Sequence, residues 1–444
     1  MNDRSTLVVA EDAVLDACGE VTFPDLGVIE QSWETNPIPT DKVIDRAQAA
    51  LGSLALEEVP DGGSIAVGVG SRGIGDLPAL VTGVVDGLRD RGFNPFVFPA
   101  MGSHGGATAA GQREMLASLG VTEDRIGCEI RSSMAVERVG KTADREVPVY
   151  AASDAVAADA IIPVNRIKPH TDFDGAVESG LSKMLVIGMG KQRGAKLAHE
   201  WAVDWSFRDM IPEITALLLA ELPVVGGVAI VENERDDTAL VEGIPPEGFL
   251  SRERELLELA YDRMPTLPFD NLDVLVVDRV GKDISGQGMD TNVIGRRPFA
   301  INEPKPDHPD IKRIYARGLT ETTHGNAMGI GSADLVHADV AEAIDTETAL
   351  VNAITASTVR GVRLPPVVAS DRAGLALALS TVGVVDPAEA RVLRVTDTMR
   401  LDRLYASEAL IAEARERSDL RVVSSSDPLT FTDGHFTAST PHEG

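Results

Sequence analysis

Three histidines and one lysine stand where their side chains could transfer protons or bind a metal ion. They are His104 in the segment GSHGGAT, His170 in KPH, Lys183 in SGLSKM and His199 in LAH. Histidine is scarce, with eight in 444 residues, yet these three fall within about a hundred positions, beside glycine, proline or a predicted strand end. Because loops at such places often carry active-site groups, the spacing indicates a site for proton transfer or metal binding.

The loop around His104 has the composition of an anion-binding turn. Gly102, Gly105 and Gly106 let the backbone approach a ligand closely, and a helix predicted directly after the loop favours an anion at its N-terminus. With Ser103, these glycines form a candidate cofactor-binding cradle for an anionic group such as a phosphate. For His104 itself, a buried structural histidine is the alternative to a catalytic one.

His170 follows a predicted buried strand at residues 159–165 and stands two positions after Lys168. The carboxylates of Asp172 and Asp174 could orient its imidazole ring and fix its tautomer. This placement favours a catalytic role for His170.

Lys183 precedes an apolar run at residues 184–187, whose low dielectric would lower the pKa of the amine and make it nucleophilic. A solvated surface lysine is the alternative. His199 lies in a segment, residues 196–205, that reads as a helix, where a capping or core histidine is the default. Zinc is not indicated, because no HExxH motif or cysteine pair accompanies His199.

The segment Gly68–Gly73 (GVGSRG) matches the dinucleotide fingerprint G-x-G-x-x-G and follows a predicted strand. A dinucleotide site also needs an acidic residue at the end of the next strand, but that strand ends in Ala100, Met101 and Gly102. Two other interpretations stay open. The glycines could serve a tight turn, or the turn could bind a phosphate or carboxylate with the guanidinium of Arg72.

The composition excludes several classes of function. The chain has 69 acidic and 41 basic residues, a formal net charge of -28, which would repel nucleic acids and anionic membranes. At 43% hydrophobic residues it can form sizeable cores. Cys18 and Cys128 make no disulfide framework, and the sequence shows neither a signal peptide nor an apolar run of membrane-spanning length. A cytoplasmic protein with a small-molecule substrate is expected.

These residues must be positioned by alternating strands and helices. Strands are predicted at residues 64–70, 94–100, 159–165 and 272–278, and helices at 77–91, 109–119 (capped by Thr108) and 211–222. The alternation predicts an α/β fold of two domains with mostly parallel sheets and an active site in the cleft between them. The expected division is 1–268 for the domain with the catalytic residues, 269–410 for a second α/β domain, and 411–444 for a tail that either packs back on the first domain or frays.

Taken together, the ordered set of residues resembles the lactate racemase family, isomerases that use a nickel pincer nucleotide (pyridinium-3,5-bisthiocarboxylic acid mononucleotide). The resemblance rests on Arg72 in a strand-loop, the Gly102-x-His104 motif, a strand that delivers His170, Lys183, and His199 downstream of it.

The resemblance implies a role for each of these residues. Lys183 would tether the cofactor through a thioamide, and His199 would complete a square-planar nickel site. His104 and His170 would act as general acid and base on opposite faces of a 2-hydroxy acid, while the cofactor takes up hydride and returns it to either face of a transient keto acid. Arg72 would hold the substrate carboxylate, and cofactor-synthesis enzymes would load the protein.

The second domain departs from the family pattern. Where the family has a Tyr-Gln pair, this chain has Ile294 and Gly295, and Arg296 or Arg297 would take the place of a substrate-binding lysine. The departure predicts a different or larger 2-hydroxy acid than lactate. Two rival hypotheses remain: an NAD-dependent oxidoreductase, and a non-enzymatic module that binds an anionic metabolite or nucleotide.

Overall fold

The computed structural model describes residues 7–71, 73–297, 304 and 306–442. The chain forms two compact units. One consists of Thr35–Met264, and the other consists of the described residues of Met1–Glu34 and Pro265–Gly444. Each unit is an α/β structure around a mostly parallel sheet, as the alternation of strands and helices predicts.

The unit Thr35–Met264 is built on a five-stranded sheet of order β4-β3-β7-β8-β9. All neighbours are parallel except β8 and β9, which are antiparallel. The strands are β3 (Ser64–Val69), β4 (Asn94–Pro99), β7 (Ala160–Arg166), β8 (Gly227–Glu232) and β9 (Thr238–Ile244), and a separate antiparallel pair is formed by β5 (Val136–Lys141) and β6 (Pro148–Ala152).

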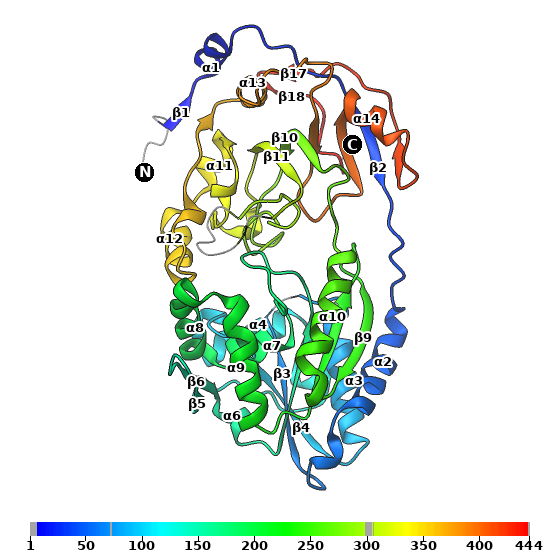
Figure 1. Ribbon diagram of the computed structural model, residues 1–444, viewed down its shortest axis with the longest axis vertical. Coiled ribbons are helices and arrows are strands. Elements are labelled where there is room, and N and C mark those ends of the chain that lie inside the picture. The colour runs from blue at the N-terminus through cyan, green and yellow to red at the C-terminus, as the bar shows by residue number, and fades with distance from the viewer. Residues whose placement is uncertain (1–6, 72, 298–303, 305, 443–444) are drawn as a thin grey trace. The chain divides into compact units, whose positions relative to one another are not determined.

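Helices cover both faces of this sheet. Along β3, Ile65, Val67 and Val69 enter one buried cluster and Ala66 enters the other, because successive side chains point to opposite faces. Figure 1 shows α8 and α9 on one side of β3, and α2 and α3 on the other. The helices are α2 (Val43–Ala50), α3 (Leu77–Arg89), α4 (Ala109–Ser118), α5 (Glu123–Ile126), α6 (Ser153–Val156), α7 (Leu181–Lys183), the π-helix η6 (Met184–Gly188), α8 (Lys191–Trp205), α9 (Phe207–Glu221) and α10 (Phe249–Asp262).

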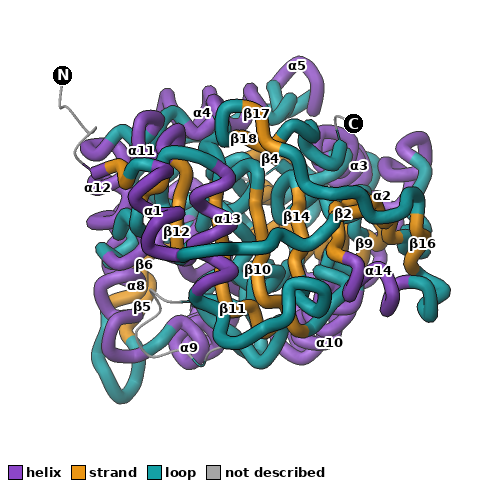
Figure 2. Tube along the Cα trace, turned by 90° about the horizontal axis from the view of Figure 1, so that it is seen from above, coloured by secondary structure: helices purple, strands orange, loops and turns teal. Residues whose placement is uncertain are grey.

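The other unit is built on a nine-stranded sheet of order β1-β13-β12-β11-β10-β14-β15-β2-β16. It is parallel from β1 to β14 and antiparallel beyond. Figure 2 shows β10 between β11 and β14, with α1 beside α13. The strands are β1 (Val8–Val9), β2 (Leu26–Gln31), β10 (Asn271–Val277), β11 (Asp310–Ala316), β12 (Leu335–His337), β13 (Val367–Val368), β14 (Val392–Val395), β15 (Arg403–Ser407) and β16 (Leu420–Val422), with the hairpin β17 (Phe431–Thr432) and β18 (His435–Phe436). The helices are α1 (Glu11–Cys18), α11 (Ala338–Ala343), α12 (Thr346–Thr355), α13 (Asp371–Ser380) and α14 (Glu408–Ala414).

The division of the chain differs from the expected one at both ends. Residues up to Glu34 were expected in the first domain, but β1 pairs with β13, and β2 lies between β15 and β16. The tail after residue 410 pairs with β2 and therefore belongs to the same unit as 265–410. The boundary expected after residue 268 lies four residues earlier, between Met264 and Pro265.

Candidate active site

Three predicted site segments leave the same edge of the five-stranded sheet. The loops after β3, β4 and β7 carry Ser71, His104 and His170, and these strands are parallel neighbours in the order β4-β3-β7. Carboxyl ends of parallel strands meet at one edge, which is where α/β proteins place their sites. The strand order therefore explains how residues far apart in the sequence reach one region.

His170 is half-buried in a loop that a buried carboxylate stabilises. Glu178 accepts hydrogen bonds from the backbone N–H groups of His170 (2.5 Å) and Gly175 (3.0 Å) and from the hydroxyl of Tyr261 (3.0 Å). Burial raises the pKa of Glu178 to about 7, these three hydrogen bonds oppose the rise, and the charge of Asp174 adds to it. The carboxyl group that organises this loop thus titrates near neutral pH.

The imidazole of His170 is oriented through a backbone contact. The N–H of Asp172 donates to Nδ1 of His170 over 3.0 Å, so the neutral ring that makes this bond carries its proton on Nε2. The expectation was that the carboxylates of Asp172 and Asp174 orient the ring. A role of either carboxylate remains a prediction; the Asp174 carboxylate accepts from the Tyr261 hydroxyl at 3.2 Å.

Lys183 ends the short helix α7, whose start is capped by a second buried carboxylate. Glu253 of α10 accepts from the backbone N–H (3.0 Å) and the hydroxyl (2.5 Å) of Ser182, and no part of Glu253 is exposed. Burial raises the pKa of Glu253 to about 7, against the hydrogen bonds from Ser182 and Leu181. The position of Lys183 is therefore tied to α10.

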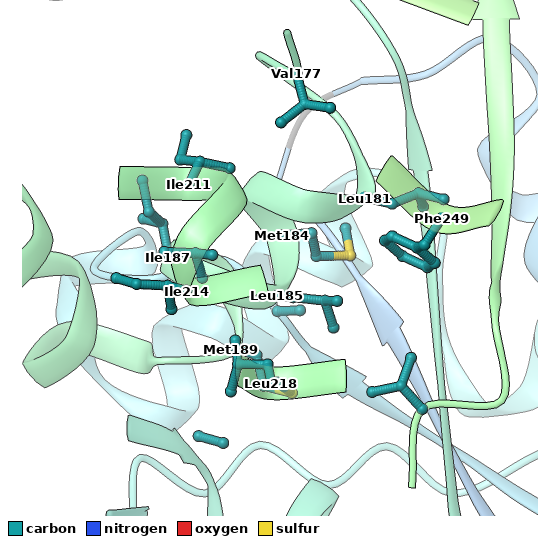
Figure 3. Close-up of a cluster of buried hydrophobic side chains, with 14 of the residues drawn as sticks. Val177, Leu181, Met184, Leu185, Ile187, Met189, Ile211, Ile214, Leu218 and Phe249 are labelled. Atoms are coloured by element: carbon teal, nitrogen blue, oxygen red, sulfur yellow. The ribbon is translucent and has the colours of Figure 1, made fainter. Parts of the chain in front are cut away.

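The apolar run after Lys183 is buried, as its sequence predicts. Residues 184–187 form most of the π-helix η6 and lie within the core, with exposed fractions of 9% or less. Figure 3 shows Met184, Leu185 and Ile187 in one cluster with Ile211, Ile214 and Leu218 of α9. Lys183 itself is half-buried.

His199 lies on α8, and the protein engages one of its ring nitrogens. Nδ1 is 2.7 Å from the carbonyl oxygen of Ala195, one helical turn earlier. Burial lowers the pKa of His199, the bond to Ala195 raises it, the Lys183 ammonium lowers it and the Asp172 carboxylate raises it. The neutral imidazole is the favoured form at pH 7, and Lys183 and Asp172 both lie within electrostatic range of it.

A row of aromatic rings connects His170 to His199. The ring of His170 lies 4.6 Å from that of Phe173, Phe173 lies 5.5 Å from Phe207, and Phe207 meets His199 edge-on at 5.2 Å, all between centroids. Three successive ring contacts thus link His170 to His199.

The loop of His104 is joined to the same region. The N–H of Gly102 donates to the carbonyl of Gly188 at the end of η6 over 3.0 Å, and a side-chain Cβ at Gly102 would lie 3.2 Å from the Cβ of Ala195. The exposed imidazole of His104 is hydrogen-bonded at Nδ1 to the hydroxyl of Ser71. His104 therefore lies on a loop that contacts η6, which directly follows Lys183, and α8, which carries His199.

The predicted anion cradle in this loop has a packing role that the structure shows directly. Gly105 and Gly106 both have positive φ, 65° and 63°. A Cβ at Gly105 would come within 2.5 Å of the backbone of Gly111, whereas one at Gly106 would meet nothing within 4 Å. Thr108 caps α4 as predicted, its hydroxyl oxygen accepting from the N–H of Gly111 over 3.1 Å, and half-buried Ser103 accepts from the N–H of Ala107 through its carbonyl.

The G-x-G-x-x-G match is explained by packing at its first two glycines. Gly68 lies inside β3, where a Cβ would meet the ring of Phe98 at 3.1 Å, and one at Gly70 would meet Met184 at 3.2 Å. A dinucleotide fingerprint instead places its glycines in the turn. Arg72 lies outside the described residues. A few residues later, the Glu232 carboxylate accepts a hydrogen bond from the N–H of Gly75 over 2.7 Å.

The two remaining predicted residues belong to the other unit. Arg296 forms an ion pair with Asp334 (2.6 Å) and donates to the carbonyl of Ser332 (3.1 Å). Arg297 is buried and donates to the amide oxygen of Asn292. Substrate binding by either arginine remains a prediction.

Four residues of the site region were missed from the sequence: Gln112, Glu178, Lys191 and Glu253. A signal existed for Glu253, which occupies an apolar-face position of its helix together with Phe249, Leu256, Leu257 and Ala260. Gln112 likewise falls one turn before buried Leu116 on α4. A polar residue at a core-facing position indicates a buried hydrogen-bond network.

Comparisons with known proteins give distant likenesses only. No family model matches the chain, and no curated protein matches it. A protein from Thermotoga maritima is similar in structure, with 15% identity over 64% of this chain and 72% of that chain, at a TM-score of 0.46. The lactate racemase apoprotein from Thermoanaerobacterium thermosaccharolyticum is 13% identical, over 89% of this chain and 96% of that chain, at a TM-score of 0.42. Likenesses of this degree do not establish a shared function.

No group of three or more His, Cys, Asp or Glu is arranged to hold a metal ion by itself in the described part of the chain. Nor does the described part contain a helix long and apolar enough to cross a membrane.

Proposed function

We propose that this chain is a racemase or epimerase of a 2-hydroxy acid that works with a nickel pincer nucleotide tethered to Lys183. One observation carries the proposal. His170 and His199 flank the ring pair Phe173 and Phe207, and the Lys183 ammonium lies within electrostatic range of His199. His104, on a loop that contacts η6 and α8, supplies the second imidazole for acid–base chemistry.

The residues fit such a cofactor in the chemistry of their donors. With Nδ1 of His199 bonded to the Ala195 carbonyl, Nε2 is the nitrogen that would bind a metal, which is the usual arrangement of a metal-bound histidine. Its lowered pKa favours the neutral form that a metal requires. His199 would supply an imidazole nitrogen to the nickel ion, and the cofactor would supply the other donors.

When bound, the cofactor would supply the centre that accepts and returns hydride at the substrate carbon. The chain's own residues would handle the hydroxyl proton. Nδ1 of His170 accepts from the Asp172 N–H, and Nδ1 of His104 is bonded to the Ser71 hydroxyl, so in each ring Nε2 is the nitrogen that would exchange a proton with substrate. Arg72 would hold the substrate carboxylate through a bidentate pair.

The test is to produce the chain together with cofactor-synthesis enzymes. A mass increase located on Lys183, bound nickel, and interconversion of the enantiomers of a 2-hydroxy acid are expected. Lys183→Ala should abolish all three. Lys196→Ala, a change of an exposed lysine on α8, should abolish none of them.

Two outcomes would favour the rival functions. Unmodified, nickel-free protein that oxidises a 2-hydroxy acid with added NAD would overturn the proposal in favour of an oxidoreductase. Binding of an anionic metabolite without any turnover, after full exposure to the synthesis enzymes, would favour a non-enzymatic module.

A further inference from the structure

Lys191 is a buried lysine where the chain passes from η6 to α8. It is the first residue of α8, which carries His199, and it follows η6, which begins directly after Lys183. Only 1% of Lys191 is exposed, and its φ of 51° lies in the left-handed region that disfavours side chains. Both a buried ammonium and a left-handed lysine are costly, so the surroundings must hold Lys191 there.

The Lys191 ammonium has neutral partners. It donates to the carbonyl oxygen of Pro99, at the end of β4, over 2.7 Å and to the amide oxygen of Gln112 on α4 over 3.0 Å. Burial lowers the pKa of Lys191 to about 8, opposed by the charge of Asp154. Both partners flank the loop of His104, one on the strand before it and one on the helix after it.

These contacts dictate which way the Gln112 amide faces. A lysine ammonium is a donor only, so the oxygen of the amide must face Lys191 and its nitrogen must face the opposite way. That nitrogen donates to the carbonyls of Gly102 (2.9 Å) and His104 (3.3 Å), and Gln112 is fully buried. Lys191 therefore acts on the loop through Gln112.

We propose that Lys191, acting through Gln112, is a positioning residue that fixes the His104 loop against η6, which directly follows Lys183, and against α8, which carries His199. A second hydrogen bond, from the Gly102 N–H to the carbonyl of Gly188, joins the loop to the end of η6. The catalytic meaning of this arrangement rests on the function proposed above. The arrangement itself does not, because it can be measured on unloaded protein.

The experiment compares hydrogen exchange in two variants. Lys191→Met keeps the aliphatic stem and removes the donors. Gln112→Glu keeps an acceptor for Lys191 but removes the donors to Gly102 and His104, so it spares the buried ammonium. In both, amide exchange at residues 102–107 should rise by about tenfold or more, while exchange in β3 and β7 stays as in the wild type.

Lys196→Met, on the exposed surface of α8, is the matched control and should change neither region. A general loss of stability would instead accelerate exchange in β3 and β7 as well. Loop exchange within about twofold of the wild type in folded Gln112→Glu would overturn the proposal, whether or not Lys191→Met folds.

A kinetic readout separates positioning from the proposed function. In loaded enzyme, Lys191→Met should leave the mass of the Lys183 adduct unchanged and lower kcat by about tenfold to a hundredfold, as small displacements of a catalytic group do. Faster loop exchange in a protein that never carries an adduct would support the positioning role and refute the function. An intact adduct with unchanged kcat and unchanged loop exchange would refute the positioning role and support the function.

Discussion

Glu253 and Tyr261 lie about two turns apart on one face of α10, and each holds a different element of the candidate site. Glu253 caps the helix of Lys183 through Ser182, and Tyr261 donates to Glu178, which organises the loop of His170. A single helix thus fixes the separation of the two elements, although it supplies none of the predicted catalytic residues.

Glu253→Gln should remove a pH dependence of stability. In the folded protein the pKa of Glu253 is raised from 4.5 to about 7, so the folded state binds more protons than the unfolded state between these values. In the wild type, this group should therefore lower the free energy of unfolding by roughly 3 kcal/mol as pH rises from about 4.5 to above 7. The Glu253→Gln variant should lack this decrease. Urea unfolding at several pH values measures the effect. Glu258→Gln, at an exposed position of α10, is the control and should keep the wild-type slope.

Tyr261→Phe should loosen the loop of His170 without disturbing the core. The change removes the hydroxyl that donates to Glu178 and Asp174, and a lost hydrogen bond of this kind costs about 1 kcal/mol. Because that bond opposes the rise in the pKa of Glu178, the pKa should increase further in the variant. Carbon-detected NMR titration of the Glu178 carboxyl would measure it, and an unchanged pKa would contradict the assignment.

Gly105→Ala and Gly106→Ala form a matched pair. Both residues have φ near 65°, so both substitutions incur the left-handed penalty of about 1 kcal/mol. Only at Gly105 does the new Cβ collide with backbone, that of Gly111, so its cost in unfolding free energy should exceed that at Gly106 by about 2 kcal/mol or more. Equal losses in thermal unfolding would show that the close approach to α4 is wrong.

His104→Ala and His170→Ala should each slow racemisation by about two to four orders of magnitude, the usual contribution of a general acid or base. Because neither residue holds the cofactor in the proposed site, nickel content and the Lys183 adduct should be unchanged. Chiral chromatography of the product, beside the intact mass of the same sample, makes the comparison. A variant that also loses the adduct would point to a structural role.

His199→Ala should separate tethering from metal retention. The side chain is proposed to bind nickel but not to form the covalent link, so the adduct on Lys183 should persist while nickel is lost on dialysis against a chelator. Elemental analysis of wild type and variant after equal dialysis decides the matter. Equal nickel contents would exclude His199 as the ligand.

Much of the scaffold follows from local sequence patterns. The strand from Ser64, the helix from Leu77 and the Thr108 cap are encoded by apolar periodicity and by a polar residue at a helix start, all of which act within a few residues. The apolar run at residues 184–187 has no period that would predict a helix or a strand, and the structure places it in a π-helix that continues a short α-helix. This run is buried on several sides, which erases periodicity.

The contacts that organise the site could not be predicted in the same way. That Glu253 would reach Ser182, or Lys191 would reach Gln112, depends on pairs of residues 71 and 79 positions apart. The histidines themselves stood out because imidazoles beside glycine and proline are chemically conspicuous. The assignment of residues up to Glu34 to the first domain failed for a related reason, since strand pairing with β13 and β15 is a long-range choice.

Because β2 fills the position between β15 and β16, cutting the chain at Met264 does not yield two independent halves. A fragment beginning at Pro265 would leave β15 with an open edge and would be prone to aggregate, whereas residues 35–264 form an uninterrupted stretch that could be excised cleanly. In topology, that stretch is a domain inserted between two segments of the chain that pair within one sheet.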